Sequence, residues 1–309
     1  MSDVTLTTDI DLAGLEASPS DRRNSFGWRL VMRRFFRQKT AVVGLAVAFL
    51  IVLAGLLAPW IAPYNVDEST SEFLKGPSSG HLLGTDQAGY DTLSRVMFAT
   101  RTSIYAALLA VVLALVGGTL IGLVSGYFGR WVDTIFMRVI DAIMAFPGLL
   151  MAMAVIGALG PGINNAMIGL SIAFMPGFAR LVRAQVLAVK EEPYVEAARV
   201  VGAGAPRIIR RHLLPNIAST LVVQAFMAIG FALLAEGGLA FIGLSVQPPD
   251  TSLGSLMQRG FTLINVTLRL ALIPGFVITL LSVSFNAIAD GLRDAMARHE
   301  ISHELAVQA

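Results

Sequence analysis

The chain has 309 residues, of which 55% are hydrophobic and only 14% charged, and its net charge at pH 7 is +2. Soluble domains carry about 25% charged residues, so this deficit excludes an ordinary soluble fold and indicates a lipid bilayer as the main solvent. The absence of cysteine excludes disulfides, thiolate metal sites and cysteine nucleophiles. The four histidines suggest no metal cluster, and the bases form no single stripe of the kind that binds nucleic acid.

Residues 1–40 predict a cytoplasmic tail that ends in a basic helix. The first twenty residues are polar and acidic, and they lack the apolar region of a signal peptide. Residues 22–39 contain seven bases and no acid, with aromatic and aliphatic residues between them. This pattern predicts a basic amphipathic helix on an anionic membrane surface, with a solvated charge run as the alternative.

Long uncharged stretches indicate membrane spans, because a bilayer core of about 30 Å requires about 20 apolar helical residues. One stretch, 142–179, is too long for one helix and is divided by the turn signal Gly160-Pro161-Gly162. The prediction is an all-α polytopic membrane protein with a transmembrane domain over 41–298 and a cytoplasmic C-terminal tail over 299–309. Its six spans are expected at about 41–62, 103–126, 135–158, 163–186, 217–239 and 270–290.

The distribution of Lys and Arg predicts the orientation. Six spans place both termini on one side, together with the loop near Arg130 and the base-rich segment 180–211. Most of the 23 Lys and Arg lie on this side, which the positive-inside rule makes cytoplasmic. The segment 63–101, on the opposite side, is net negative. We therefore expect a multi-pass plasma-membrane protein with both termini in the cytoplasm.

Three glycines in the second span, Gly118, Gly122 and Gly126, recur at intervals of four. This spacing produces a flat strip on one helix face and predicts close packing inside the chain, with contact to a second subunit as the alternative. After the fifth span, the apolar run 237–245 is too short to cross the membrane and predicts a shallow or re-entrant element.

Charged residues near the interfaces predict local contacts. On the inner end of the third span, Arg138 and Asp141 are spaced to form an ion pair along one helix. In the outer segment, Asp86, Asp91 and Arg95 are expected to cap and brace the loop.

The loop between the fourth and fifth spans predicts a helix, a glycine turn and a second helix that project from the membrane. Acids and Pro193 favour a helix start, and Gly202 and Gly204 favour its end. Pro206 begins a second short helix, which Pro215 is expected to close at the membrane. A projection with a small-residue tip can enter a groove on another protein; a solvated loop without function is the alternative.

This loop resembles the EAA loop of ABC importer permeases. That motif has Glu-Ala-Ala, three residues, a glycine and nine residues before its final turn. The matching residues, with the two turn residues, are Glu196, Ala197, Ala198, Gly202, Gly204, Pro206, His212, Leu214 and Pro215. His212 stands where isoleucine is usual. The resemblance implies a coupling helix that is seated in a cleft of an ATPase subunit.

Further segments resemble the permeases for dipeptides, oligopeptides and nickel, so that the likeness covers about 25–298. Tyr90 stands where that family commonly has a base, and Leu82 where proline is common. The short basic arm is similar to that of the second permease of the pair. The matching segments are 81–95, 145–147, 241–244 and 291–294.

The resemblance implies an ATP-driven importer in the bacterial inner membrane, in which this chain forms half of a pore for peptides. Nickel or another small solute is the alternative cargo. The implied partners are a second permease, two ATPase subunits, an extracytoplasmic solute-binding protein and membrane lipid. Glu236, an acid near membrane depth, and Phe146 are candidates for the substrate pathway, although pairing between helices is the competing role for Glu236.

The sequence contains no phosphate-binding loop of the form Gly-x4-Gly-Lys-Ser/Thr, so ATP and Mg are expected on partner subunits and no cofactor on this chain. A secondary transporter or channel is a second alternative, but such proteins commonly carry charges within their spans. A serine hydrolase is disfavoured because Gly169–Ala173 lacks the final glycine of Gly-x-Ser-x-Gly. No catalytic residue is therefore predicted.

Overall fold

The computed structural model describes residues 30–247 and 249–307, and within them the chain is a bundle of helices with two isolated β-bridges in one loop. Residues 1–29 of the predicted N-terminal tail and basic helix over 1–40 lie outside the described residues. In chain order the elements are α2 (Lys39–Leu56), α3 (Ala58–Ile61), α4 (Thr92–Phe128), α5 (Arg130–Met144), α6 (Gly148–Leu159), α7 (Ile163–Val189), α8 (Pro193–Val200), α9 (Ala205–Ile208), the π-helical turn η2 (Ile209–Leu213), α10 (Leu214–Phe241), α11 (Leu253–Phe261) and α12 (Arg269–Val307).

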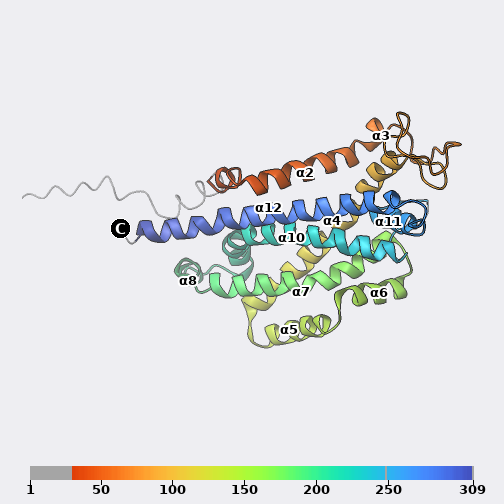
Figure 1. Cartoon of the computed structure of the whole chain (residues 1–309). Helices are drawn as coiled ribbons and strands as arrows, with labels where there is room; N and C mark the ends of the chain where they lie inside the picture. The colour runs from red at the N-terminus through yellow and green to blue at the C-terminus, as the bar shows by residue number, and fades with distance from the viewer. Residues whose placement is uncertain (1–29, 248, 308–309) are drawn as a thin grey trace, which may run out of the picture.

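Five helical segments in the described residues are long and apolar enough to cross a membrane, namely α2, α4, α7, the continuous path 205–241 and α12. The pair α5 and α6 makes a sixth when the two are counted as one span. The long helices lie side by side, with α8 at one end of the bundle and α11 at the other (Figure 1). We call these the α8 end and the α11 end. The predicted all-α membrane fold is confirmed.

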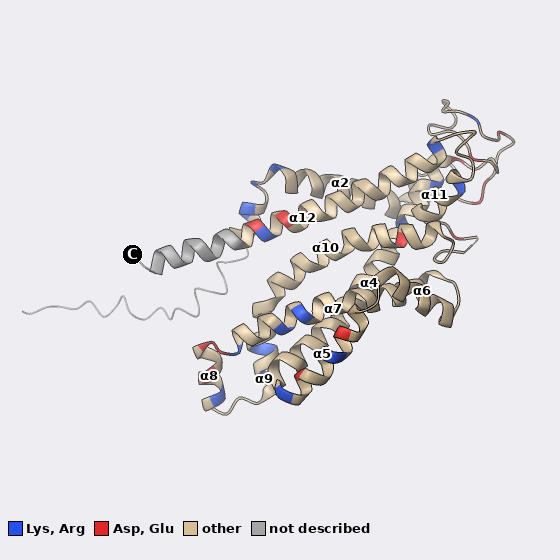
Figure 2. Ribbon diagram, turned by 60° about the horizontal axis from the view of Figure 1, so that its bottom comes forward, with Lys and Arg blue, Asp and Glu red and all other residues tan. Residues whose placement is uncertain are grey.

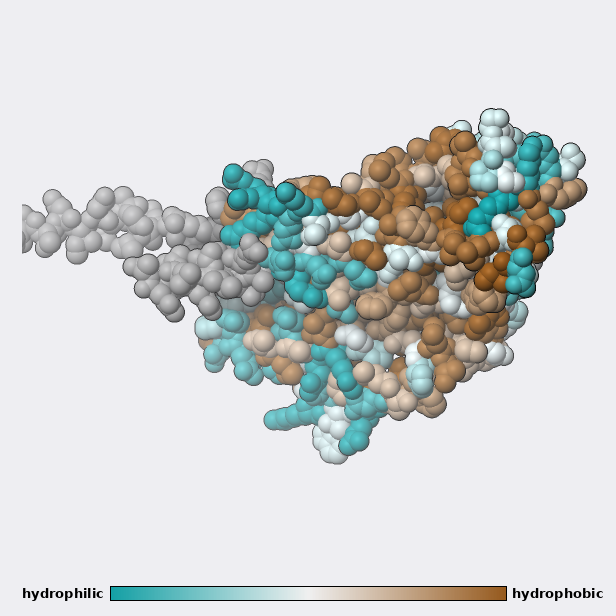
Figure 3. All heavy atoms as spheres, in the orientation of Figure 1, coloured by the Kyte–Doolittle hydropathy of each residue, from teal (hydrophilic) through white to brown (hydrophobic). Residues whose placement is uncertain are grey.

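The surface has the distribution that a bilayer requires. Large apolar side chains such as Phe49, Leu120 and Phe276 are exposed along the spans. On the face drawn in Figure 3, brown apolar atoms cover the middle and hydrophilic groups lie toward the two ends. Lys and Arg gather near the ends of the helices (Figure 2).

The third span is not the single helix predicted over 135–158. Helices α5 and α6 meet at an angle of 92°. The break falls at Phe146 and Pro147 because proline lacks the N–H that a helix requires and disfavours helical backbone at the residue before it. The expected Arg138–Asp141 pair is also absent from this part of the chain: Asp141 instead accepts a hydrogen bond of 2.6 Å from Arg180 on α7.

The glycine strip on α4 packs against α7, as predicted for contact inside the chain. A Cβ atom at Gly118 would lie 2.7 Å from the carbonyl oxygen of Met175, and one at Gly122 would lie 2.6 Å from that of Ala179. These backbone atoms cannot move aside easily, so the missing side chains are what allows the two helices to approach.

Helix α12 extends along the bundle beside α2 and α10. Val31 and Phe35, in a short helix before α2, pack with Leu292 and other buried residues of α12. Val31 and Phe35, in the described part of this basic segment, therefore contact protein, while the placement of the segment on a membrane surface stays a prediction. Residues 299–307, expected as a separate tail, continue α12 to Val307.

Helix α10 extends farther than the sequence predicted. It continues to Phe241 and ends where Gly243 has a φ of +80° and Leu244 N–H donates to the Leu239 carbonyl. The prediction of a shallow element over 237–245 is thus wrong for residues 237–241, which belong to the span itself. A short helix does occur later, as α11, which begins with a capping box between Ser252 and Ser255.

Candidate functional site

The α8 end carries a helix–turn–helix that projects from the bundle (Figure 1). Pro193 stands at the start of α8, where its missing N–H costs no hydrogen bond, and Glu196 lies in the first turn, where its charge complements the helix dipole. Helix α8 ends at Val200 after two turns. The predicted first helix of the loop is therefore present.

Gly202 ends α8 in a geometry that favours glycine. Its φ is +88°, and the N–H groups of Gly202 and Ala203 donate to the carbonyls of Arg199 and Ala198, each at 2.9 Å. This pair of bonds is the Schellman motif, in which the residue with positive φ reverses the chain. Gly204, in contrast, has a φ of −70° and begins α9. The angle between the two short helices thus depends on Gly202.

The base of the projection is fixed to the bundle. Val195 of α8 and Ile208 of α9 are fully buried and belong to the main apolar core. The Arg199 guanidinium lies 5.7 Å from the ring centroid of Tyr127 on α4, and Lys190 Nζ donates to the Gly126 carbonyl at 3.2 Å. These contacts join α8 and the residue after α7 to the end of α4.

The tip is apolar and exposed. Val200 and Val201 are 83% and 88% exposed, and Glu196 and Ala197 beside them are also exposed. Glu196 forms no ion pair with any residue the structure describes. The two adjacent branched side chains give the tip a small exposed apolar surface. Sequence reasoning missed the two valines, although an apolar pair directly before a positive-φ glycine is visible in the sequence.

The second helix of the loop does not stop at Pro215. Helix α9 passes through η2 into α10, and Pro215 stands in the first turn of α10. The π turn satisfies the backbone with longer-range hydrogen bonds, which accommodates a proline that a regular helix interior would exclude. Asn216 Nδ2 donates to the His212 carbonyl at 2.6 Å and to the Tyr194 hydroxyl at 2.9 Å. This residue links the start of α8 to the start of α10.

The structure thus brings most of the predicted coupling residues into one projection. Ala198 is half-buried, while Gly202, Gly204 and Pro206 are exposed around the turn. His212, Leu214 and Pro215 lie at its base, on η2 and the start of α10. Their role in coupling remains a prediction.

The two residues predicted for the substrate pathway do not share a surface. Phe146 is 61% exposed at the break between α5 and α6. Glu236 is completely buried and accepts hydrogen bonds from Ser103 at 3.0 Å and Ser245 at 3.4 Å. These bonds join α10 to α4 and to the loop before α11, which supports pairing between helices as the role of Glu236.

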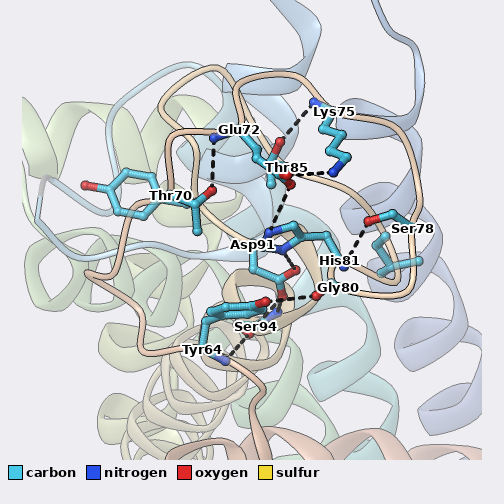
Figure 4. A network of polar contacts seen from close by, with 12 residues as sticks. Tyr64, Thr70, Glu72, Lys75, Ser78, Gly80, His81, Thr85, Asp91 and Ser94 are labelled. Carbon is cyan, nitrogen blue, oxygen red and sulfur yellow. Dashed lines mark hydrogen bonds and ion pairs between the residues drawn. The ribbon is translucent and has the colours of Figure 1, made fainter.

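At the α11 end, the loop over residues 62–91, between α3 and α4, is held by a polar network (Figure 4). We call it the braced loop. His81 Nδ1 lies 2.9 Å from Asp91 Oδ1, and its ring stacks on Tyr64 with centroids 4.7 Å apart. Asp91 also caps α4 by accepting from Ser94 N–H at 2.8 Å. At the exposed edge, the hydrogen bond that Lys75 donates to Glu72 lowers the pKa of Glu72. The predicted cap at Asp91 is confirmed.

Two arginines secure the same loop. Arg95 donates to Asp86 at 2.7 Å, which confirms the predicted brace. Arg269, at the start of α12, donates to the carbonyls of Lys75, Leu83 and Thr85 at 2.5 to 3.1 Å. A guanidinium with several donors thus joins three points of the loop to the last span.

Apolar spans, a projecting helical loop at one end and a braced loop at the other define a polytopic membrane transport subunit. Residues 118–301 match the family model described as binding-protein-dependent transport system inner membrane component. Residues 27–77 match the N-terminal transmembrane domain of oligopeptide transport permease C. The chain therefore belongs to the family of binding-protein-dependent transport system inner membrane components.

Individual relatives agree with this assignment. The dipeptide transport system permease protein of Alkalihalophilus pseudofirmus is 38% identical over 270 residues, which is 87% of this chain and 89% of the relative. The glutathione transport system permease protein of Pectobacterium atrosepticum is 39% identical over 272 residues, covering 87% and 90%. A solved methionine ABC transporter in an inward-facing conformation has a TM-score of 0.51 at 17% identity, covering 65% of this chain and 96% of that chain. That likeness confirms the fold of an ABC importer permease.

Proposed function

We propose that this chain is a permease subunit that forms half of a peptide pore in a bacterial inner membrane and is driven by a separate ATPase. The names of relatives with 37–39% identity, which include dipeptide and glutathione transport permeases, support a short peptide as cargo. In this proposal the chain carries no catalytic group and no cofactor, and ATP and Mg are bound by two partner ATPase subunits. A second permease and an extracytoplasmic binding protein complete the assembly.

The proposal places the α8 end in the cytoplasm. Support comes from the basic side chains that surround the projection, which include Lys190, Arg199, Arg207, Arg210 and Arg211. Positive side chains near span ends are retained on the cytoplasmic side of bacterial membranes. The α11 end then faces the binding protein.

The observation that carries the proposal is the combination of an exposed apolar tip and a buried base in one short unit. Val200 and Val201 are exposed and accessible to a groove on a partner, whereas Val195 and Ile208 are completely buried in the core. A unit of this kind converts a force on its tip into a shift of whole helices, because packed cores respond as rigid bodies.

The inferred cycle is alternating access. When ATP closes the two ATPase subunits, the α8 tips of the two permeases are drawn together. The ends of α4 and α7 follow through Tyr127 and Lys190, and the pore opens toward the docked binding protein. Hydrolysis reverses the movement. In this cycle the chain contributes coupling and a pathway, and cargo selection begins on the binding protein.

Affinity purification of the tagged chain from native membranes tests this function. The expected result is co-purification of two ATPase chains and a second permease, with ATP hydrolysis that a dipeptide-loaded binding protein stimulates. Recovery of the chain without any nucleotide-binding partner would instead support a secondary transporter or channel. Uptake of labelled dipeptide by cells with and without this chain then tests the cargo.

A further inference from the structure

A small cavity at the α11 end lies among α4, α11, the start of α12 and the braced loop. Its volume is about 120 Å³, which is room for a group of a few non-hydrogen atoms. Most of the wall is apolar, with Val96, Leu256 and Leu270 among its residues, and the guanidinium-bearing side chains Arg95 and Arg259 line it as well.

The cavity contains more positive than negative charge. Asp86 is the carboxylate in its wall, and it already accepts three hydrogen bonds. Asp86 Oδ1 accepts from the N–H groups of Ala88 and Tyr90 at 2.8 and 3.0 Å, and Oδ2 accepts from Arg95 at 2.7 Å. The Arg259 guanidinium makes no hydrogen bond and no ion pair with any side chain or carbonyl within 30–247 and 249–307.

Two residues of the same wall also have buried polar atoms without partners. Arg95 is 8% exposed and Thr92 is 6% exposed. Neither Arg95 Nε nor Thr92 Oγ1 has a hydrogen-bond partner among the described residues. Burial and, next, the nearby Arg95 charge lower the pKa of Arg259, and the charge of Asp86 opposes this shift without cancelling it. Arg95 Nε and Thr92 Oγ1 are both enclosed by protein, so the donor that a group in the cavity can reach is the Arg259 guanidinium. A partly buried guanidinium without an acceptor costs free energy, so an anion beside Arg259 would complete the site.

We propose that this cavity is a binding site for a carboxylate, with the Arg259 guanidinium as its main donor. A planar guanidinium pairs with a carboxylate through two parallel hydrogen bonds. The apolar wall at Val96 and Leu256 suits the aliphatic carbon attached to such a group. The carboxylate belongs to a short solute or to a side chain of a protein docked at the α11 end. The site is separate from the α8 loop, and its test does not require transport.

The test uses the full chain in lipid nanodiscs, with sodium acetate as the probe and thermal unfolding as the readout at constant ionic strength. Acetate is expected to raise the unfolding midpoint of the wild type, whereas the neutral analogue acetamide leaves it unchanged. Arg259→Gln should weaken the apparent acetate affinity about tenfold or more, and Arg259→Lys should retain part of it. Arg101→Gln is the matched control, because Arg101 is an exposed arginine of α4 outside the cavity.

A dipeptide and its C-terminal amide distinguish the two sources of the carboxylate. Stabilisation by acetate and alanyl-alanine, but not by alanyl-alanine amide, assigns the site to a solute. Stabilisation by acetate alone assigns it to a protein side chain that enters the narrow cavity. The proposal is overturned if acetate has no effect, if acetamide acts like acetate, if Arg259→Gln responds like the wild type, or if inorganic phosphate stabilises more than acetate.

Discussion

Arg183 of α7 holds Asp133 of α5 by two hydrogen bonds, 2.5 Å from Nε to Oδ1 and 2.6 Å from Nη2 to Oδ2. Ser125 of α4 donates to the same carboxylate. Both charged side chains are partly shielded, at 33% and 20% exposed. This bidentate pair joins α5 to α7 at the α8 end. Because α5 and α6 meet at 92°, α5 is not held in place as part of one straight span.

Loss of this pair should release α5. Asp133→Asn is expected to lower the free energy of unfolding by about 1–3 kcal/mol, because it leaves a partly buried guanidinium with a weaker partner. Thermal unfolding in nanodiscs measures the effect, and a double-mutant cycle with Arg183→Gln isolates the coupling. The matched control is Asp290→Asn, since the Asp290–Arg293 pair is mostly exposed and such pairs contribute little. Equal effects of Asp133→Asn and Asp290→Asn would contradict this account.

The two glycines of the projecting loop should differ in their tolerance of alanine. Gly202→Ala places a Cβ on backbone with a φ of +88°. The backbone strain is expected to destabilise the native turn by about 1 kcal/mol or more, although no atom lies near the new methyl group. Gly204→Ala, at a φ of −70°, is the control and should transport normally. Dipeptide uptake and ATP hydrolysis by the purified complex are the readouts.

Gly202→Asp should abolish uptake while the chain still inserts into the membrane, because it adds both backbone strain and a charge at the docking tip. Gly202→Asn should be milder, since asparagine adopts positive φ more readily than other residues. Normal uptake by the aspartate variant would show that this turn is not part of coupling.

The glycine strip of α4 gives a graded test of helix packing. Gly122→Ala drives a methyl group to 2.6 Å from a backbone oxygen of α7 and should lower the unfolding midpoint and the yield of membrane protein. Gly117→Ala meets the flexible end of Met175, which can move, so its effect should be small. If both variants behave alike, the spans are not packed as described.

Arg269 should control the order of the loop at the α11 end. Arg269→Gln removes donors to three carbonyls, so the amides of Leu74 and Thr85, which are bonded across the loop, should exchange hydrogen faster. Hydrogen–deuterium exchange of the full chain in nanodiscs measures this change. Lys75→Gln, which alters an exposed ion pair with Glu72, is the control and should leave the exchange nearly unchanged. Unaltered exchange in Arg269→Gln would refute the anchoring role.

Features with strong local causes could be predicted from sequence. The helix end at Gly202, the helix start at Pro193 and the cap at Asp91 each depend on a few neighbouring residues, and all are present. The approximate spans and the α4 glycine strip also followed from local composition and spacing.

Features that depend on neighbours distant in sequence were harder to predict. The sequence suggested Arg138 as the partner of Asp141, but the tertiary arrangement of α5 and α7 supplies Arg180 instead. The strength of the bend at Pro147 and the π turn before Pro215 were missed because proline indicates a disturbed helix without specifying how the chain responds. The carboxylate cavity depends on Arg95 and Arg259, which are distant in sequence and meet only in the folded chain.

The central claim is that the α8 tip docks on an ATPase, and cysteine cross-linking tests it most directly. The chain has no cysteine, so Val201→Cys introduces a single thiol at a position that is 88% exposed. A thiol-to-amine cross-linker in native membranes should join this variant to a nucleotide-binding subunit, with a yield that changes when ATP is added. Phe73→Cys, 63% exposed in the loop at the α11 end, should give no such product. The account is contradicted if Val201→Cys captures no nucleotide-binding protein, or if Phe73→Cys captures it equally well.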